Sequence, residues 1–381
     1  MEFTAFTAGK DDEGKRLDKL VRAVLDGRAI PGRGPGMNIF QALRKRLVRL
    51  NGGKAEASAR VHEGDQIEVA SFLLAGAAGS REKQASRPNP SLQTSTAKEA
   101  PQAPHPARSS MRLEVLFQND DIMLINKPAG ISVQPSSGGK ESISQIVREE
   151  WEAAGPHGSL SFTPAPLHRL DRNTTGILAI SRSARGAAWF SRAIRERSIR
   201  KIYIGICMGR LEEDALWEDW LAADSGSGGN RGTCFHTVRR AEAAGDGRKG
   251  RSSLARTQVH PVSHGYSGKN ELTLVQYELL TGRKHQIRAQ SALRGHPLYG
   301  DTAYGGLPRD AESRAGDDNP VGRSRVGNFF LHALRMEFPP DNPLSLPESV
   351  EAPLPEEFSA AMQFFPPQSL QNSTSGSIIY Q

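Results

Sequence analysis

The stretch Pro166-Leu-His-Arg-Leu-Asp171-Arg-Asn-Thr-Thr-Gly176-Ile-Leu-Ala-Ile180 joins a charged, turn-rich first half to an apolar second half. Residues 177–180 are few, apolar and rich in β-branched side chains, which predicts a short buried strand. The preceding Asn-Thr-Thr-Gly has the composition of a turn, and Gly176 can adopt the backbone angles that a tight turn requires. We therefore expect Asp171 on a loop that runs directly into a rigid sheet.

Asp171 stands between two arginines, Arg169 and Arg172. A carboxylate flanked by guanidinium groups is expected to stay ionised well below neutral pH, which would make it available as a nucleophile or a base. The alternative is a structural ion pair at a strand end, because ion-pair networks also perturb charges. The stretch alone leaves both interpretations open.

The composition of the 381-residue chain allows two or three domains with a substantial core. Its 49 Lys and Arg against 42 Asp and Glu give a net charge of +7 and a pI near 9.5, which favours a polyanionic partner such as nucleic acid. Two cysteines, Cys207 and Cys234, argue against a disulfide scaffold and fit a reducing cytoplasm. No apolar run approaches the roughly 18 residues of a membrane span, and the polar N-terminus does not resemble a secretory signal. We expect a cytoplasmic monomer with no membrane partner.

A first domain is expected over residues 13–72. Apolar residues recur at helical spacing from Leu17 to Leu25, and a second helix is predicted over residues 38–50 after a glycine- and proline-rich break. In that helix one face would be apolar, formed by Phe40, Leu43, Leu47 and Leu50. The opposite face would be basic, formed by Lys45, Arg46 and Arg49. Such a face either binds RNA or is simply solvated; residues 60–69 then predict a turn and a strand.

The remaining chain divides by composition. Residues 73–111 are dominated by Ala, Ser, Pro and Gln without an apolar period, which predicts a flexible linker. A second domain is expected over residues 112–365, followed by a disordered tail over 366–381. Its first elements are a hairpin around residues 115–125 and the turn Asn-Lys127-Pro-Ala-Gly, whose lysine either faces an anion or caps the loop. Further helices are predicted at 141–154 and 184–195, strands at 198–207, 257–261, 272–279 and 329–338, and an exposed excursion at 221–253.

Two further groups of residues could carry chemistry. Lys201 and Tyr203 lie two apart on a predicted strand and therefore share one face. Arg283, His285 and Arg288 crowd into a turn that opens a predicted helix. Cationic side chains beside helix N–H groups suit a phosphate or a carboxylate, although arginines also bridge loops without binding a ligand.

Other kinds of site are not indicated. The histidines show no paired ligand spacing and the two cysteines are far apart, so no metal site is expected. The glycine-rich segments lack the order of a phosphate-binding loop, and no serine has the surroundings of a nucleophile elbow. We expect no metal and no nucleotide cofactor.

Taken together, HRLDRNTTG, RKIY, TGRKHQIRAQ and GHPLYGD, in this order after NKPAG, resemble the pseudouridine synthases of the RluA family. The resemblance runs from about residue 113 to residue 340. It implies an α/β (α+β) fold, the pseudouridine synthase fold, with a mixed and mostly antiparallel central sheet. RLDKL, the basic segment, NGG and EGDQIEV within residues 13–72 resemble the small S4-like (alpha-L) RNA-binding domain.

The resemblance also implies roles for single residues. Asp171 would be the catalytic aspartate, and Arg169 would enter the RNA helix to fill the space left by a flipped uridine. Tyr203 would pack on the target base, Arg288 would pair with the catalytic carboxylate, and Ile287 would line the base pocket. The other residues expected to contact RNA are His168, Lys201, Arg283 and His285 in this domain and Lys45, Arg46 and Arg49 in the first. The chain departs from the family pattern at Gln134, Thr175 and Gln290, none of which is a catalytic position.

The sequence therefore predicts an enzyme that isomerises uridine to pseudouridine in structured RNA, with large-subunit (23S-type) ribosomal RNA as the expected target. The carboxylate could attack the sugar or the base, or remove a sugar proton. A transfer RNA target is one alternative. A non-catalytic RNA-binding or folding factor is another.

Overall fold

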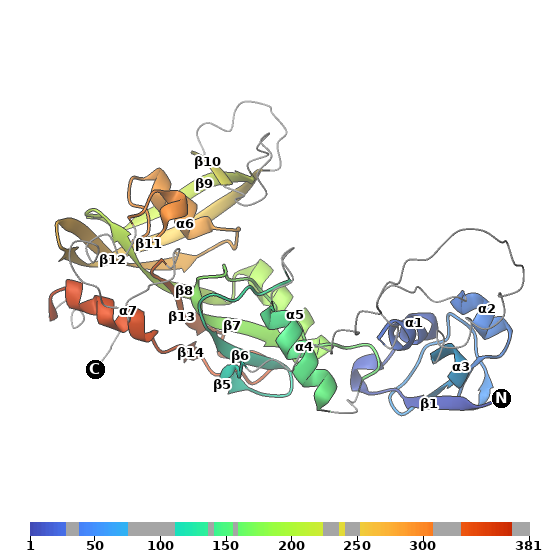
Figure 1. Ribbon diagram of the computed structural model, residues 1–381. Coiled ribbons are helices and arrows are strands. Elements are labelled where there is room, and N and C mark those ends of the chain that lie inside the picture. Colours follow the sequence, from blue (N-terminus) through green and yellow to red (C-terminus); the bar gives the residue numbers. More distant parts are fainter. Residues whose placement is uncertain are drawn as a thin grey trace, which may run out of the picture. The chain divides into compact units, whose positions relative to one another are not determined.

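The computed structural model describes residues 1–27, 38–74, 111–135, 141–154, 159–223, 236–240, 252–307 and 329–367. These residues belong to two compact units (Figure 1). Unit 1 comprises residues 1–111 together with 148–163, and unit 2 comprises residues 112–147 and 164–381. The predictions for the break at 32–36, for most of the linker and for nearly all of the tail lie outside the described residues.

Unit 1 contains a four-stranded antiparallel sheet with the order β1-β4-β2-β3. The predicted first helix is confirmed as α1, whose Leu17, Leu20 and Val21 are fully buried. The predicted final strand is confirmed as β4. The elements are β1 (Phe3–Thr7), η1 (Lys10–Asp12), α1 (Leu17–Gly27), α2 (Ile39–Arg44), β2 (Val48–Leu50), β3 (Gly53–Lys54), β4 (Gln66–Ala70) and α3 (Ser71–Leu74).

The second helix, predicted over residues 38–50, is shorter than expected, and the prediction of one basic helix face was wrong. α2 ends at Arg44, because Arg46 adopts a left-handed backbone (φ 58°) and Val48–Leu50 pair with β4 instead. Arg49 therefore lies on a strand, with its guanidinium 4.1 Å from the centre of the Phe3 ring. Phe40, expected in the core, is 51% exposed. The apolar spacing of this segment fitted a helix and a helix–turn–strand equally well.

Unit 1 also includes a segment from far along the chain. Asp12 is fully buried, and its carboxylate accepts hydrogen bonds from the Leu160 backbone N–H (2.7 Å) and from the Ser159 and Ser161 hydroxyls (3.1 and 2.6 Å). Leu160 packs against the apolar core of the unit. Ser159, Leu160 and Ser161 fall within the range predicted for the second domain, yet they pack with the first.

Unit 2 is built on a ten-stranded sheet with the order β10-β9-β11-β12-β8-β13-β7-β6-β5, to which β14 adds by pairing with β13. Among the described residues only β7 and β13 pair in parallel. This mixed, mostly antiparallel sheet confirms the predicted fold class. The strands are β5 (Glu114–Gln118), β6 (Ile122–Lys127), β7 (Thr175–Ser181), β8 (Arg200–Met208), β9 (Ala215–Ala223), β10 (His236–Arg240), β11 (Ser252–Ser267), β12 (Asn270–Leu279), β13 (Leu331–Glu337) and β14 (Ser349–Glu351).

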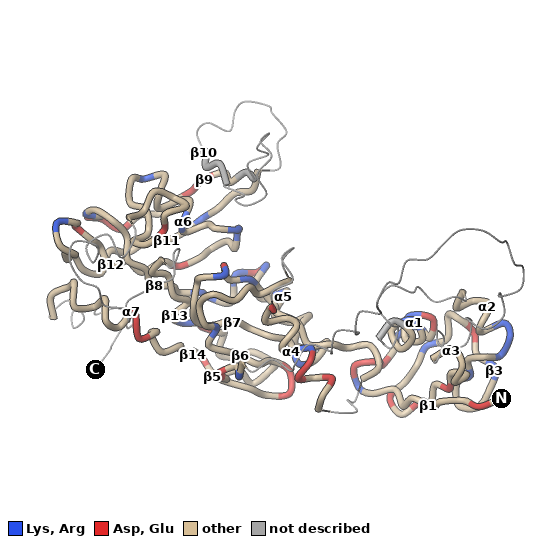
Figure 2. The backbone as a smooth tube through the Cα atoms, in the orientation of Figure 1, with Lys and Arg blue, Asp and Glu red and all other residues tan. Residues whose placement is uncertain are grey.

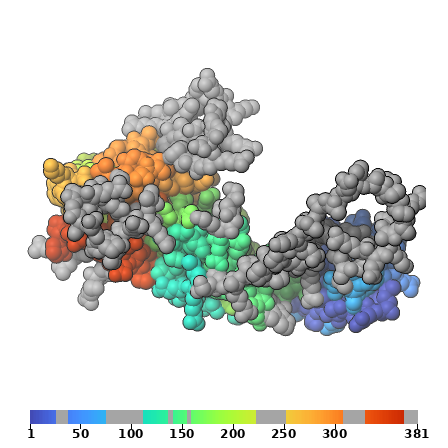
Figure 3. Space-filling model, in the orientation of Figure 1, coloured from blue at the N-terminus to red at the C-terminus, as the bar shows by residue number. Residues whose placement is uncertain are grey.

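Helices cover this sheet and confirm the predicted ones: α4 (Ile143–Ala153), α5 (Ala184–Glu196) and α6 (Gln286–Leu293), followed by the short η3 (Thr302–Tyr304), α7 (Glu356–Ala361) and η6 (Met362–Phe364). The excursion predicted at 221–253 was partly wrong, because β9 continues to Ala223 and residues 236–240 add a strand beside it. In the space-filling view the part from α4 to β8, cyan to green, lies against the yellow and orange part from β11 to α6 (Figure 3). None of the helices in the described residues has the length and apolarity to cross a membrane.

β7 is the strand predicted from residues 177–180, and all seven of its residues are buried. Gly176 has a φ of 99°, and a Cβ atom placed there would lie 2.3 Å from the Ala333 carbonyl oxygen. Only glycine allows β13 to approach β7 this closely. The close approach fixes the end of β7 and therefore the loop that carries Asp171.

Candidate active site

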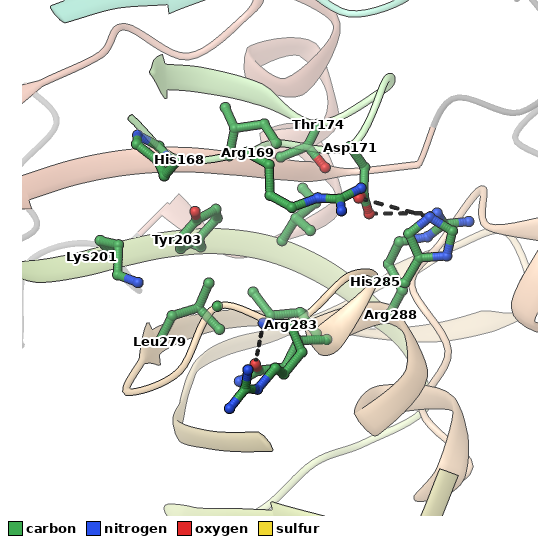
Figure 4. Close-up of a pocket in the computed structure, with 15 residues that line it drawn as sticks. His168, Arg169, Asp171, Thr174, Lys201, Tyr203, Leu279, Arg283, His285 and Arg288 are labelled. Atoms are coloured by element: carbon green, nitrogen blue, oxygen red, sulfur yellow. Dashed lines mark hydrogen bonds and ion pairs between the residues drawn. The ribbon is translucent and has the colours of Figure 1, made fainter. Parts of the chain in front are cut away.

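A pocket of about 80 Å³ lies where the loop before β7, strand β8 and the start of α6 meet (Figure 4). Apolar walls and convergent polar side chains share its lining, as in small-molecule binding sites. It continues into a wider groove of about 770 Å³, and the two share Arg169, Leu170, Asp171, His285 and Arg288. The pocket is lined by His168, Arg169, Leu170, Asp171, Thr174, Lys201, Tyr203, Leu279, Gly282, Arg283, His285, Gln286, Ile287, Arg288 and Leu331.

Asp171 is the only carboxylate among these lining residues, and its side chain is 14% exposed. Its Oδ2 lies 3.6 Å from Arg288 Nη1, and its Oδ1 lies 3.7 Å from His285 Nε2. Burial raises the pKa of Asp171 above its usual value, although the charges of Arg288 and Arg169 oppose this. Desolvation is therefore a larger effect on this carboxyl than the neighbouring arginine charges, which were the only effect that the sequence indicated.

Arg172 does not face Asp171. Its Nε donates to the Gly130 carbonyl (2.8 Å), and the Gly130 N–H donates to the Arg172 carbonyl (3.0 Å). The Lys127 ammonium is fully buried and donates to the carbonyls of Pro128, Ile131 and Arg172 at 2.7 to 3.0 Å. Of the two alternatives for Lys127, the structure shows the loop cap. These bonds fix the backbone immediately after the catalytic candidate.

Tyr203 and Lys201 share one face of β8, as predicted, and both line the pocket (Figure 4). They are 5% and 9% exposed. Burial, followed by the charge of Asp171, raises the pKa of the Tyr203 hydroxyl, so it is neutral at physiological pH. Burial lowers the pKa of the Lys201 ammonium. The pocket therefore presents an aromatic face and a poorly solvated cation opposite the loop of Asp171.

The turn before α6 and the first turn of that helix contribute three of the predicted side chains. His285 caps α6 with a left-handed backbone (φ 54°), and its Nδ1 lies 3.0 Å from the Tyr304 hydroxyl. Arg283 is exposed at the rim, and its Nε donates to the Leu254 carbonyl (3.1 Å), so it bridges two loops while it lines the pocket. Arg288, from the first turn of α6, reaches Asp171 as predicted.

Ile287 lines the pocket, as expected, and so do His168 and Arg169. His168 Nε2 accepts a hydrogen bond from the Ala179 N–H (3.0 Å), and its ring stacks on Phe190. Burial, with the nearby Lys201 charge, lowers the pKa of His168 to about 3, so the ring is neutral and its evident role is to hold the loop against the sheet. Arg169 is exposed, and Figure 4 shows its side chain reaching over the pocket toward Asp171.

The three basic residues of unit 1 do not line this pocket. Lys45 and Arg46 are exposed on the turn after α2, and Arg49 follows on β2. Figure 2 shows Lys and Arg positions gathered on the chain between α2 and β3. A role in binding RNA remains a prediction for them.

The sequence-based prediction missed three residues that surround Arg288. Asp301 binds its guanidinium through both oxygens, and the rings of Tyr304 and Phe329 lie on it. Asp301 is the last residue of the motif GHPLYGD, so the sequence indicated that it follows a glycine turn. No local pattern indicated that it would bind Arg288.

The three departures from the family pattern have structural explanations or lie at the edge of the site. Gln134 lines the wider groove. Thr175 Oγ1 lies 2.8 Å from Nδ1 of the buried His332. Gln290 is fully buried and donates to Asp219 Oδ2 (2.7 Å).

Comparison with known proteins decides the family. Residues 121–293, which include every pocket-lining residue except Leu331, match the family model described as RNA pseudouridylate synthase. The chain belongs to the RluA family of pseudouridine synthases. As a member of the RluA family it is an RNA pseudouridine synthase, an isomerase.

RluA-family relatives match over most of the chain. The ribosomal large subunit pseudouridine synthase C of Haemophilus influenzae is 25% identical over 87% of this chain and 86% of its own length. The enzyme of the same name from Escherichia coli K12 is 25% identical over 95% of this chain and 96% of its own length. Among solved structures, human RNA pseudouridylate synthase domain containing 4 is 22% identical, covers 66% of this chain and 92% of its own, and has a TM-score of 0.46.

Proposed function

We propose that this enzyme converts specific uridines of large-subunit ribosomal RNA to pseudouridine, with Asp171 as the nucleophile and with the target nucleotide flipped into the pocket. The observation that carries the proposal is the meeting of Asp171, Arg288 and Tyr203 in one buried pocket. The curated relatives act on ribosomal RNA by name and match this chain over nearly its full length.

The proposed reaction uses the carboxylate twice. An Asp171 oxygen attacks C1′ of the flipped uridine, and the bond from C1′ to N1 breaks with its electrons left on the uracil. After the base turns, C5 attacks C1′ and displaces the carboxylate. C5 then loses its proton to solvent, and N1 takes one up. The reaction is an isomerisation, so it needs neither oxidant nor reductant.

The environment of Asp171 suits a nucleophile. Arg288 at 3.6 Å keeps the carboxylate available in its charged form, while the partial burial that raises its pKa leaves it more basic than an exposed aspartate. The Tyr203 ring and the apolar wall of Leu279, Ile287 and Leu331 would hold the released base by stacking and packing.

Access to a stacked uridine requires an opened RNA helix, which costs a few kcal/mol. Arg169 is exposed at the pocket mouth, where its side chain could occupy the vacated space. His285, Arg283 and Lys201 also line this pocket and would contact the phosphates or the base. The exposed Lys45 and Arg46, with Arg49, would add a second RNA contact through an S4-like unit 1.

The proposal further includes a monomer acting in the cytoplasm. One chain supplies every side chain that the reaction uses. A ribosomal RNA substrate would be available to it in that compartment.

The test is tritium release from RNA labelled at uridine C5, with large-subunit ribosomal RNA and transfer RNA offered separately. We expect release from ribosomal RNA by the wild-type chain. We expect none above background from Asp171→Ala or from the isosteric Asp171→Asn, with the RNA dissociation constant unchanged within about twofold.

Each other outcome has a clear meaning. Release from transfer RNA alone would replace the proposed substrate. Full release by Asp171→Asn would place the nucleophile elsewhere. Binding without release from any RNA would favour the non-catalytic factor.

A further inference from the structure

Arg288, the partner of Asp171, is held more tightly by a different carboxylate. Its Nε donates to Asp301 Oδ2 at 2.7 Å and its Nη2 donates to Asp301 Oδ1 at 2.8 Å. The nearest approach to Asp171 is longer, 3.6 Å from Nη1. Asp301 is 2% exposed and Arg288 8%. The short, bidentate pair therefore decides where the guanidinium lies.

Aromatic rings fix the plane of that guanidinium as well. Its central carbon lies 4.4 Å from the centre of the Phe329 ring and 4.8 Å from that of Tyr304. With Nε and Nη2 bound to Asp301, Nη1 is the nitrogen that remains for Asp171. Arg288 can approach Asp171 only as closely as Asp301 allows.

The backbone around Asp301 is rigid. Its N–H donates to the Leu298 carbonyl (3.0 Å), and its own carbonyl accepts from the N–H groups of Tyr304 and Gly306 (3.0 and 2.9 Å). A Cβ atom at Gly306 would lie 2.2 Å from the Leu298 oxygen, so the turn is packed to the limit of a glycine. Asp301 is thus a fixed point from which Arg288 is aimed.

One guanidinium therefore serves two buried carboxylates. We propose that Asp301 is a positioning residue of the isomerase reaction, which aims Arg288 and withholds part of its charge from Asp171, so that the nucleophile stays reactive. A carboxylate fully paired with an arginine would be a weaker nucleophile, because its electrons would be held by the cation. This inference rests on the proposed role of Asp171.

Other charged groups act on Asp171 besides this pair, and a test must leave them unchanged. The charged or ionisable groups lie on the Asp171 loop, on the turn before α6 and at the end of β6: Arg169, Lys284, His285 and Lys127. The neutral Tyr203 hydroxyl on β8 is the other titratable group beside Asp171.

The test is the pH dependence of kcat for tritium release by Asp301→Asn. The amide keeps the size of the side chain and one oxygen for Arg288, but it removes the negative charge. We expect the acid limb of the profile to move to lower pH by about one unit or more, since Asp171 then receives the full charge of Arg288. We expect the plateau kcat to fall about tenfold, with KM nearly unchanged.

If Asp301 has a purely structural role, Asp301→Asn should lower kcat or the Tm, but the acid limb of its pH profile should stay where it is in the wild type. That result, or a shift of the limb to higher pH, would overturn the proposal. Asp341→Asn, which changes an exposed carboxylate of the same unit, is the matched control and should leave both limb and plateau unchanged.

Asp301→Glu keeps the charge and displaces it, so it supplies an independent arm if the asparagine variant does not fold. Here the acid limb should stay within about 0.3 pH units and the Tm should stay at the wild-type value while kcat falls about tenfold. An unchanged kcat, or a kcat that falls together with the Tm, would refute the positioning role. Asp171→Asn is measured beside them. If it retains full release, the proposed function itself has failed, whatever the Asp301 variants do.

Discussion

Replacing Lys127 by methionine tests whether the lysine that caps the loop beside Asp171 is buried strongly enough to make the stability of the protein depend on pH. Burial lowers the pKa of the Lys127 ammonium to about 7 in the folded chain, against an ordinary value of 10.5. Between pH 7 and pH 10.5 the unfolded chain therefore keeps a proton that the folded chain has lost. Stability of the wild type must then rise with pH over this range, by at most about 1.4 kcal/mol per pH unit.

The magnitude follows from the two pKa values. Between pH 7 and pH 9 the titration of this single lysine should add about 2 kcal/mol to the free energy of unfolding of the wild type. Lys127→Met lacks the proton and should lack this rise. The variant should also be less stable at both pH values, because the carbonyls of Pro128 and Ile131 lose a donor.

The assay is urea unfolding followed by tryptophan fluorescence at pH 7 and pH 9. The quantity compared is the difference in free energy of unfolding between wild type and variant, in which other titrating groups cancel. Lys269→Met, at an exposed lysine of the same unit, is the control and should show no change with pH. Equal pH dependence of wild type and Lys127→Met would refute the reasoning, since Lys127 would then titrate as an exposed lysine does.

Three further changes test other parts of unit 2. Gly176→Ala should lower the free energy of unfolding in urea by more than about 3 kcal/mol, because the strain at φ 99° adds to a clash of the new Cβ with the Ala333 oxygen at 2.3 Å. The control Gly130→Ala, whose Cβ would meet open space, should lower it by only about 1–2 kcal/mol. Burial lowers the pKa of His332 to about 4 from 6.5, so the unfolded chain binds a proton before the folded chain does as the pH falls. From pH 6.5 to 4.5 the free energy of unfolding of the wild type should therefore fall by about 2 kcal/mol more than that of His332→Phe. An equal fall in both proteins would contradict this. Tyr203→Phe keeps the stacking face, so RNA affinity should stay within about twofold. Because C5 loses its proton to solvent in the proposed reaction, kcat should also be nearly unchanged; a loss of roughly 10²-fold or more would instead assign the proton transfer to the Tyr203 hydroxyl.

The parts of the fold that local pattern determines could be predicted from the sequence. The run at 177–180 is too short and too apolar for anything but a buried strand, and the spacing from Leu17 to Leu25 left one helical interpretation. The pocket residues were found because they lie in compact motifs that resemble those of the RluA family, and this resemblance gave Asp171, Tyr203 and Arg288 their expected roles. The site was predictable where its chemistry is local.

What failed depends on contacts between distant segments. The direction of the pKa shift of Asp171 could not be derived from its neighbours in the sequence, because burial by the surrounding elements outweighs the charges of Arg288 and Arg169. The α2 segment was misassigned because pairing of Val48–Leu50 with β4 overrides a pattern that fits a helix. Asp301 was missed because only the turn of the chain after α6 brings it back to Arg288.

The hydrogen bonds from residues 159–161 to Asp12 bear on how this protein can be divided for experiments. A fragment that starts at residue 112, where composition suggests a cut, would carry the Leu160 segment without the core that covers it. Such a fragment would expose an apolar side chain and three donors that have lost their acceptor, only a few positions ahead of the HRLD loop. Low activity of that truncation would then report damage to the excised piece, and kinetic comparison should use point variants in the intact chain.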